Sequence, residues 1–121
     1  MVTSVPTIAV FPEEKLTQSQ KVEKWTWHLC RALEQNYDNR YPNSSDPVRF
    51  RMELGRKYWK IMQNDGGVHA FIDRNTGEVY KPASYKSPAK HVRYDMRLIR
   101  HRDFLHNPAN VDWAGGYLYI R

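Results

Sequence analysis

Hydrophobic residues recur at helical spacing between positions 17 and 37. The apolar positions, each three or four residues from the next, are Val22, Trp25, Leu29, Leu33 and Tyr37. Thr17 and Gln20 have the spacing of a capping box, in which each side chain satisfies a free backbone N–H at the start of a helix. The pattern therefore predicts an amphipathic helix of about five turns that ends near Asn36.

After residue 47 the pattern changes to short runs of alternating apolar and polar residues, which are typical of half-buried strands. We expect four strands, at 48–54, 57–62, 68–73 and 78–81. The turn-forming sequences Asn64–Gly67 and Arg74–Gly77 separate the last three strands. Such brief links favour antiparallel pairing in a meander. The competing interpretation of the first strand is a helix with Asp46 as its N-cap and Pro47 at its first position.

The rest of the chain is less regular. We expect a loop or a short helical turn at 87–94, a helix at 95–104, and a last strand at 117–120 that joins the sheet. Residues 1–15 are predicted to form an arm, in which Ile8–Phe11 can add a short edge strand.

These elements predict an α+β fold. Residues 16–121 would form a single domain, in which the N-terminal amphipathic helix packs on a small antiparallel meander sheet of four to five strands. The helix is needed because a small sheet requires a packing partner to be stable.

Composition narrows the class of protein. The 121 residues are 40% hydrophobic and 13% aromatic, which excludes a wholly disordered chain. Nineteen Lys and Arg residues against thirteen Asp and Glu give a net charge of +6, which favours an anionic partner.

Cys30 is the only cysteine, so an intrachain disulfide and a Cys-rich zinc site are excluded and an intracellular location is expected. The longest uncharged run, Val2–Pro12, is too short to span a bilayer, and we expect no membrane partner.

Basic residues and tyrosines alternate along the segment 81–102, where few acidic residues occur. Clustered cations bind phosphates, and exposed aromatic rings stack on the bases of single strands. We therefore expect this basic, aromatic face to contact nucleic acid or an acidic host protein. The candidate contact residues are Lys81, Tyr85, Lys86, Lys90, His91, Arg93, Tyr94, Arg97 and Arg100. The alternative is a solvated basic face whose tyrosines pack inward.

Catalytic and metal-binding patterns are weak. The five histidines include no pair at metal-binding helical spacing, so neither a metal nor another cofactor is expected. Ser84, Ser87 and His91 could be drawn as part of a triad with Asp73 or Glu78, but no nucleophile elbow or phosphate loop frames them. We expect a protein that is not an enzyme.

The stretch from Gly55 to Asp95, together with the closing residues 112–121, resembles a group of small uncharacterised proteins of tailed bacteriophages. The shared segments are Gly55–Tyr58, Val68–Asp73, Thr76–Lys81, Ala83–Lys90 and Gly116–Tyr119. Tyr85 stands where that group more usually has Trp, and Pro82 where Ala is commoner. The N-terminal helix lies outside the resemblance.

The resemblance implies a phage-encoded protein in the host cytoplasm or the virion, and it carries over no activity. Combined with the basic segment, it suggests an accessory binding protein that acts in the host cytoplasm. The alternative is a structural virion component that contacts other virion proteins through its N-terminal arm and a sheet edge. The oligomeric state is left open by the sequence.

Overall fold

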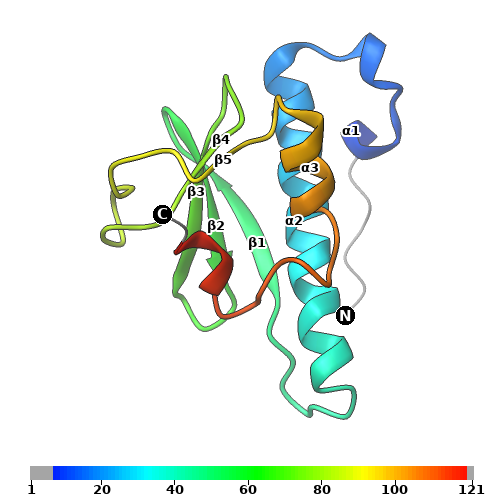
Figure 1. Cartoon of the computed structure of the whole chain (residues 1–121), viewed down its shortest axis with the longest axis vertical. Coiled ribbons are helices and arrows are strands. Elements are labelled where there is room, and N and C mark those ends of the chain that lie inside the picture. The colour runs from blue at the N-terminus through cyan, green and yellow to red at the C-terminus, as the bar shows by residue number, and fades with distance from the viewer. Residues whose placement is uncertain (1–6, 120–121) are drawn as a thin grey trace.

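A long helix packs on one face of a five-stranded sheet in the computed structural model, which describes residues 7–119 (Figure 1). The helices are α1 (Thr7–Val10), η1 (Glu13–Lys15, a 3-10 helix), α2 (Gln18–Arg40), α3 (Ile99–Leu105) and η2 (Gly116–Leu118, also 3-10). The strands are β1 (Phe50–Leu54), β2 (Tyr58–Gln63), β3 (Val68–Asp73), β4 (Glu78–Tyr80) and β5 (Tyr94–Asp95). The predicted α+β fold is confirmed.

The capping box at the start of α2 forms as predicted. The Thr17 hydroxyl accepts a hydrogen bond from the Gln20 N–H at 3.2 Å, and the Gln20 side chain accepts one from the Thr17 N–H at 2.9 Å. The helix continues to Arg40, beyond the predicted end near Asn36, since Tyr37 is still on its buried face. The five apolar positions of the sequence pattern are all buried.

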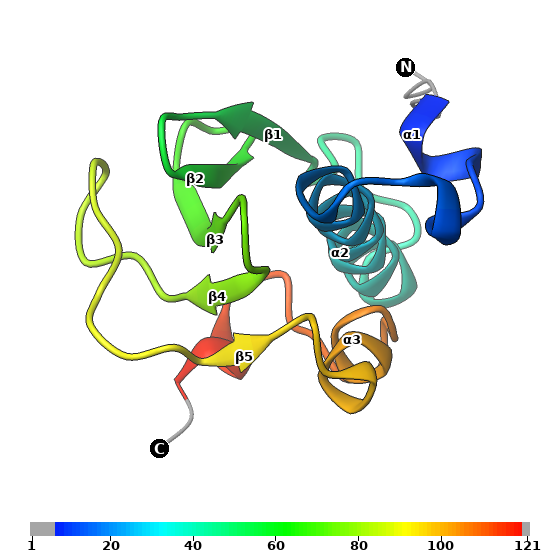
Figure 2. The same cartoon turned by 90° about the horizontal axis from the view of Figure 1, so that it is seen from above.

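The sheet is an antiparallel meander in the order β1-β2-β3-β4-β5. Its two faces are set by the register, which pairs Ile61 with Ala70 and Ile72 with Val79 on the face toward α2. We call this the inner face, and Figure 2 shows α2 lying against it. Tyr58, Lys60, Phe71 and Tyr80 alternate with those residues and so lie on the opposite, outer face.

The fifth strand comes from a different segment than predicted. Tyr94 is predicted to end a loop or short helical turn and Asp95 to begin a helix, but the two residues pair with β4, with Tyr94 opposite Val79. The predicted strand at 117–120 is wrong, because residues 116–118 form η2 and the position beside β4 is already taken by β5. Gly115, with a φ of 90°, turns the chain into η2. Ile120 lies outside the described residues.

The predicted edge strand at Ile8–Phe11 is also wrong, since residues 7–10 form the short helix α1. The described part of the arm packs on α2: the Lys24 ammonium donates to the Phe11 carbonyl at 3.2 Å, and the Trp25 indole N–H donates to Glu13 Oε1 at 2.9 Å. A helix satisfies its own backbone groups, whereas a strand here would need a sheet edge beside it. Residues 1–6 of the predicted arm lie outside the described residues.

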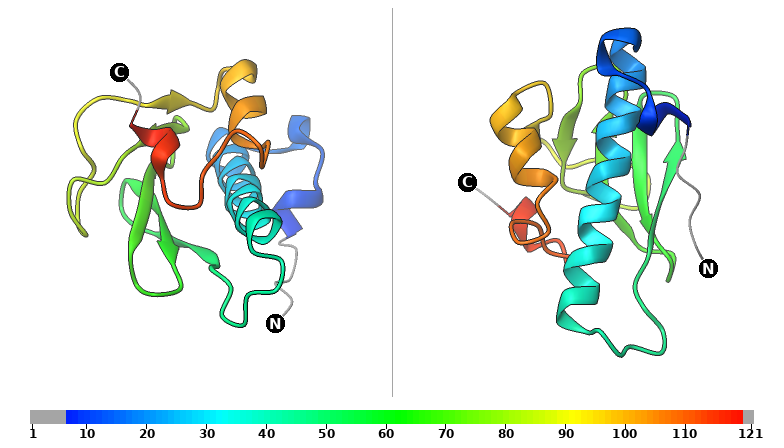
Figure 3. Two further views of the ribbon diagram at one scale, coloured as in Figure 1. Left: turned by 60° about the horizontal axis from the view of Figure 1, so that its bottom comes forward. Right: turned by 90° about the vertical axis from the view of Figure 1, so that its right-hand side faces the viewer.

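The predicted helix at 95–104 is shorter and begins at Ile99. The Asp95 N–H donates to His101 Nδ1 at 2.9 Å, and the Arg102 guanidinium donates to the Met96 carbonyl at 2.8 Å, so residues 95–98 form a hydrogen-bonded link instead. The two views in Figure 3 place α3 and η2 on the same side of α2. Within residues 7–119 no helix is both long enough and apolar enough to cross a lipid bilayer.

Candidate functional site

The loop between β4 and β5 folds back on itself as a narrow hairpin. Its backbone is held by the Ala83 N–H, which donates to the Ser87 carbonyl at 3.0 Å, and the Ala89 N–H, which donates to the Lys81 carbonyl at 2.7 Å. Figures 1 and 2 both show this loop, in yellow-green and yellow, on the side of the sheet away from α2 and α3. The loop therefore presents its tip near the outer face.

Two of the predicted contact residues, Tyr85 and Lys86, join the outer face. Tyr85 is 56% exposed, and the Lys60 ammonium lies 4.1 Å from the centre of its ring. Lys86 lines a hollow of about 360 Å³ together with residues of β1, β2 and β3. The loop and the sheet thus build one surface from segments that are far apart in the sequence.

We call this surface the basic hollow. Its cations are Arg56, Lys57, Lys60 and Lys86, and its aromatic rings are Tyr58, Phe71 and the neighbouring Tyr85. Glu53 is the acidic residue in its lining, and it pairs with Arg51 at 2.9 Å between Nη2 and Oε2. That pairing compensates the negative charge, so the four cations set the sign of the potential in the hollow.

The aromatic rings of the outer face form a continuous strip. The centre of the Tyr58 ring lies 5.8 Å from that of Phe71 and 5.8 Å from that of Tyr80, and both pairs meet edge to face. The Lys57 ammonium is 5.5 Å from the centre of the Tyr58 ring, and that of Lys60 is 5.7 Å from Phe71. Cations thus lie beside Tyr58 and Phe71. The Phe71 ring is only 2% exposed, so Tyr58 and Tyr80, which are half-buried, are the accessible rings of this strip.

The structure separates other predicted contact residues from the basic hollow. Lys81 lies over the ring of Tyr119, 4.4 Å from its centre. Lys90 and His91 are exposed in the loop, and His91 has a positive φ of 76°. Arg93 is half-buried, and its backbone N–H donates to the Val79 carbonyl at 2.7 Å.

Three predicted contact residues lie at the β5–α3 end of the molecule. Tyr94 is only 8% exposed, and its hydroxyl donates to the Tyr117 carbonyl at 2.7 Å, so it belongs to the core. Arg97 forms a forked pair with Asp95, with contacts of 3.0 and 2.7 Å, and these hydrogen bonds hold the pKa of Asp95 below its usual value. Arg100 is exposed on α3. The segment 81–102 is thus spread over several surfaces instead of forming one face.

The sequence pattern does not reveal the contribution of β2 and of the turn before it. It predicts Lys57, Tyr58 and Lys60 only as strand residues, although they supply half of the cations and one ring of the basic hollow. A signal was present: Tyr58 and Lys60 alternate with Trp59 and Ile61, which places them on the opposite face of the strand.

Polar groups of the core and of the loop between β4 and β5 form hydrogen bonds within the molecule. His69 Nε2 lies 2.7 Å from the Tyr117 hydroxyl, and burial lowers the pKa of His69 to about 4. Ser84 and Ser87 hydrogen-bond to each other at 3.1 Å between their hydroxyl oxygens. Among residues 7–119, no group of three His, Cys, Asp or Glu side chains is placed to hold a metal ion.

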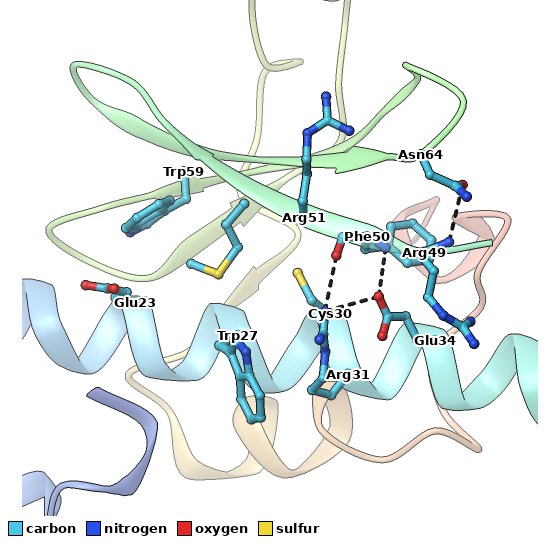
Figure 4. A pocket seen from close by; sticks show the side chains of 11 residues that line it. Glu23, Trp27, Cys30, Arg31, Glu34, Arg49, Phe50, Arg51, Trp59 and Asn64 are labelled. Atoms are coloured by element: carbon cyan, nitrogen blue, oxygen red, sulfur yellow. Dashed lines mark hydrogen bonds and ion pairs between the residues drawn. The ribbon is translucent and has the colours of Figure 1, made fainter. Parts of the chain in front are cut away.

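A second hollow is an apolar groove of about 480 Å³ between α2 and the edge strand β1 (Figure 4). We call it the α2–β1 groove. Trp27 and Cys30 of α2, Met52 of β1 and Trp59 of β2 give it an apolar lining. Burial raises the pKa of the Cys30 thiol to about 12, so the thiolate needed of a nucleophile does not form there near neutral pH.

One end of the α2–β1 groove is closed by an ion pair. The Phe50 N–H donates to Glu34 Oε2 at 2.9 Å, and the Phe50 carbonyl accepts from Arg31 Nη2 at 3.1 Å. Arg31 and Glu34 are themselves 3.1 Å apart, and Figure 4 shows all these contacts. The helix thus satisfies both outward backbone groups of Phe50.

Comparison with known proteins gives one family. The model of a family of unknown function, DUF7717, matches residues 9–120. Comparison with curated proteins and with solved structures gives no significant match.

Proposed function

Since the chain belongs to this family of unknown function, which assigns no activity, we propose its function from the basic hollow. The protein is a phage-encoded accessory protein of the host cytoplasm that binds a polyanion and catalyses no reaction. Single-stranded nucleic acid is the polyanion that the basic hollow favours, and an acidic host protein is the other partner of the same charge.

The observation that carries this proposal is the position of the Lys60 ammonium, 4.1 Å from the ring centre of the exposed Tyr85. A cation beside an exposed ring can contact a phosphate while the ring stacks on the adjoining base. Lys57 and Lys86 lie around the same hollow and extend the positive potential. Duplex DNA keeps its bases stacked inside, so it would use the cations alone.

The test is binding of a fluorescent single strand and of a duplex of the same length across a salt series. Phosphate contacts release counterions, so affinity should fall with salt from about 50 to 200 mM, with a log–log slope of about −0.7 for each cation contacting a single strand. Four contacts would give a slope of about −3. We expect the single strand to bind more tightly than the duplex.

A pair of charge-matched variants locates the site. The triple variant Lys57→Ala, Lys60→Ala, Lys86→Ala should reduce the slope for the single strand by about 2. The control removes three exposed cations elsewhere, with Lys15→Ala, Arg40→Ala and Arg100→Ala, and should change the slope little. Equal effects of the two triple variants would contradict binding in the basic hollow. If neither nucleic acid binds even at low salt, an acidic protein becomes the partner to seek.

A further inference from the structure

The outer edge of β1 offers free backbone groups along part of its length. Arg49 and Gly55, at the two ends of the strand, form backbone hydrogen bonds with Asn64 and Tyr58 on the β2 side. Because backbone groups alternate in direction along a strand, Phe50, Met52 and Leu54 direct theirs away from β2. The bonds from Phe50 to Arg31 and Glu34 confirm this direction.

Within the described part of the chain, side chains of α2 bond to the outward backbone groups at one end of the β1 edge and not at the other. We call these the closed end and the open end. At Phe50, the Arg31–Glu34 pair occupies the positions that a neighbouring strand would take. Among residues 7–119 no side chain bonds to the outward backbone groups of Met52 and Leu54, and the Leu54 side chain is 54% exposed. Figure 4 shows β1 diverging from α2 toward this open end.

The side chains at the open end define what can lie there. Met52, Trp27 and Trp59 make an apolar lining, and Glu23 adds a carboxylate. Among residues 7–119 the Glu23 side chain has no ion pair or hydrogen bond, whereas the arginines that line the closed end are paired: Arg31 with Glu34, Arg49 with Asp38 and Arg51 with Glu53. The uncompensated charge of the groove is therefore negative and lies at its open end.

We propose that the α2–β1 groove binds an extended peptide segment of another protein, which adds to the edge of β1 beyond the Arg31–Glu34 pair. Free backbone donors and acceptors along one wall select a polypeptide in strand conformation over other apolar ligands. The uncompensated Glu23 beside Trp59 selects a cationic side chain in that peptide. This site shares Leu54 with the lining of the basic hollow but lies on the other side of β1, and peptide binding there does not depend on nucleic-acid binding.

The register specifies the peptide further. In an antiparallel addition, one peptide residue lies opposite Leu54 and the residue two positions later lies opposite Met52, and both direct their side chains to the inner face. The first would be Lys or Arg near Glu23 and Trp59. The second would be apolar and would lie near Trp27 and Met52. The expected sequence is thus Lys or Arg, any residue, then an apolar residue.

The experiment is selection from a library of displayed random heptapeptides on the immobilised full chain, followed by affinity measurement of the enriched peptides. We expect enrichment of Lys or Arg two positions from an apolar residue. The variant Glu23→Lys should replace this preference by Asp or Glu at the same position. Enriched peptides without a preferred charge, or a preference that Glu23→Lys leaves unchanged, would overturn the proposal.

A matched pair of variants at Leu54 tests strand addition itself. Leu54→Pro removes an N–H that points away from β2, a position where an edge strand accepts proline. It should weaken binding of the enriched peptide about tenfold, whereas Leu54→Ala, which keeps the N–H, should change it little. Equal binding by both would overturn strand addition.

A second test is used if Leu54→Pro lowers the thermal stability of the protein. Methylation of the peptide nitrogen opposite Met52 removes a backbone hydrogen bond between peptide and β1 without changing the protein. Unchanged affinity of the methylated peptide would also overturn strand addition. If the protein forms a concentration-dependent dimer that the peptide cannot dissociate, the β1 edge binds a second copy of the chain, and the proposal of a peptide partner is overturned.

Discussion

The two faces of the sheet are built from the same strands and have opposite properties. On the inner face, Ile61, Ile72 and Val79 are 0% exposed and pack in the core with α2. On the outer face, Tyr58 and Lys60 remain half-exposed beside cations. The difference shows that the inner face supplies the core against α2, while the outer face buries Phe71 and leaves Tyr58 and Lys60 accessible for binding.

The largest effect is expected on the inner face. Leu29→Ala removes a side chain that is 0% exposed and leaves a cavity between α2 and the sheet. The free energy of unfolding should fall by about 2–5 kcal/mol, as measured by urea denaturation. The matched change Leu54→Ala, at a side chain that is 54% exposed, should cost less than about 0.5 kcal/mol. Leu54 is also on the inner face but lies outside the buried core, so similar losses for the two variants would contradict stabilisation by burial in that core.

A pH effect should follow from His69, the buried histidine of β3. Burial lowers the pKa of His69 from 6.5 to about 4 in the folded protein, so the folded state favours the neutral ring. The resulting stability is complete above about pH 6.5 and is lost as the pH falls toward 4. The loss from this one group is at most about 3 kcal/mol. His106, whose pKa burial also lowers to about 4, acts in the same direction.

The check is urea denaturation of the wild type and of His69→Phe at a series of pH values. The variant loses the contact with Tyr117 and should be less stable near neutral pH. Its stability should nevertheless fall less steeply with decreasing pH, because one of the histidines whose pKa burial lowers is absent. An unchanged pH dependence would contradict a folded state that keeps His69 neutral.

A smaller effect, on binding alone, is expected on the outer face at the exposed ring of the loop. Tyr85→Ala should weaken binding of a single strand by about 1–3 kcal/mol through lost base stacking, with little change in the slope against salt. Tyr119→Ala removes another exposed tyrosine, which lies beside Lys81 outside the basic hollow. Fluorescence titration of the two variants separates the sites, and equal weakening would count against stacking on Tyr85.

The smallest effect is expected from a single cation. Lys86→Ala should reduce the slope of log affinity against log salt by about 0.7 for a single strand. The free energy of unfolding should stay within about 0.5 kcal/mol, because Lys86 is exposed. Arg100→Ala removes the same charge from α3 and serves as the control. A larger reduction of this slope by Arg100→Ala than by Lys86→Ala would indicate that the nucleic acid contacts the surface of α3 instead of the basic hollow.

Much of the fold was predictable because it depends on local patterns. The capping box at Thr17 and Gln20 and the alternation of β1 to β4 each specify an element without reference to the rest of the chain. The failures are short segments that depend on their neighbours. Tyr94–Asp95 is a strand because β4 offers it a free edge, and residues 116–118 are not, because that edge is already occupied.

The candidate site was only partly predictable for the same reason. Aromatic character and charge predict Tyr85 and Lys86 as contact residues, and these two residues do adjoin or line the basic hollow. Tyr94 and Arg97 are also predicted as contact residues, because they are close in sequence to Tyr85 and Lys86. In the structure Tyr94 lies in the core, and Arg97 forms an ion pair with Asp95. Proximity along the chain is a poor guide to a shared surface once a strand and a turn lie between the residues.

Hydrophobic periodicity along the chain specifies the long helix, four of the strands and the face of each strand that is buried, because these properties depend on a few neighbouring residues. Which cations share a surface and which edge remains open depend instead on contacts between distant segments. Lys60 meets Tyr85 because the loop folds back over the sheet. The edge of β1 is open only from Met52 onward because the Arg31–Glu34 pair of α2 reaches Phe50 and no further. Both results depend on packing between distant segments, which no local pattern encodes.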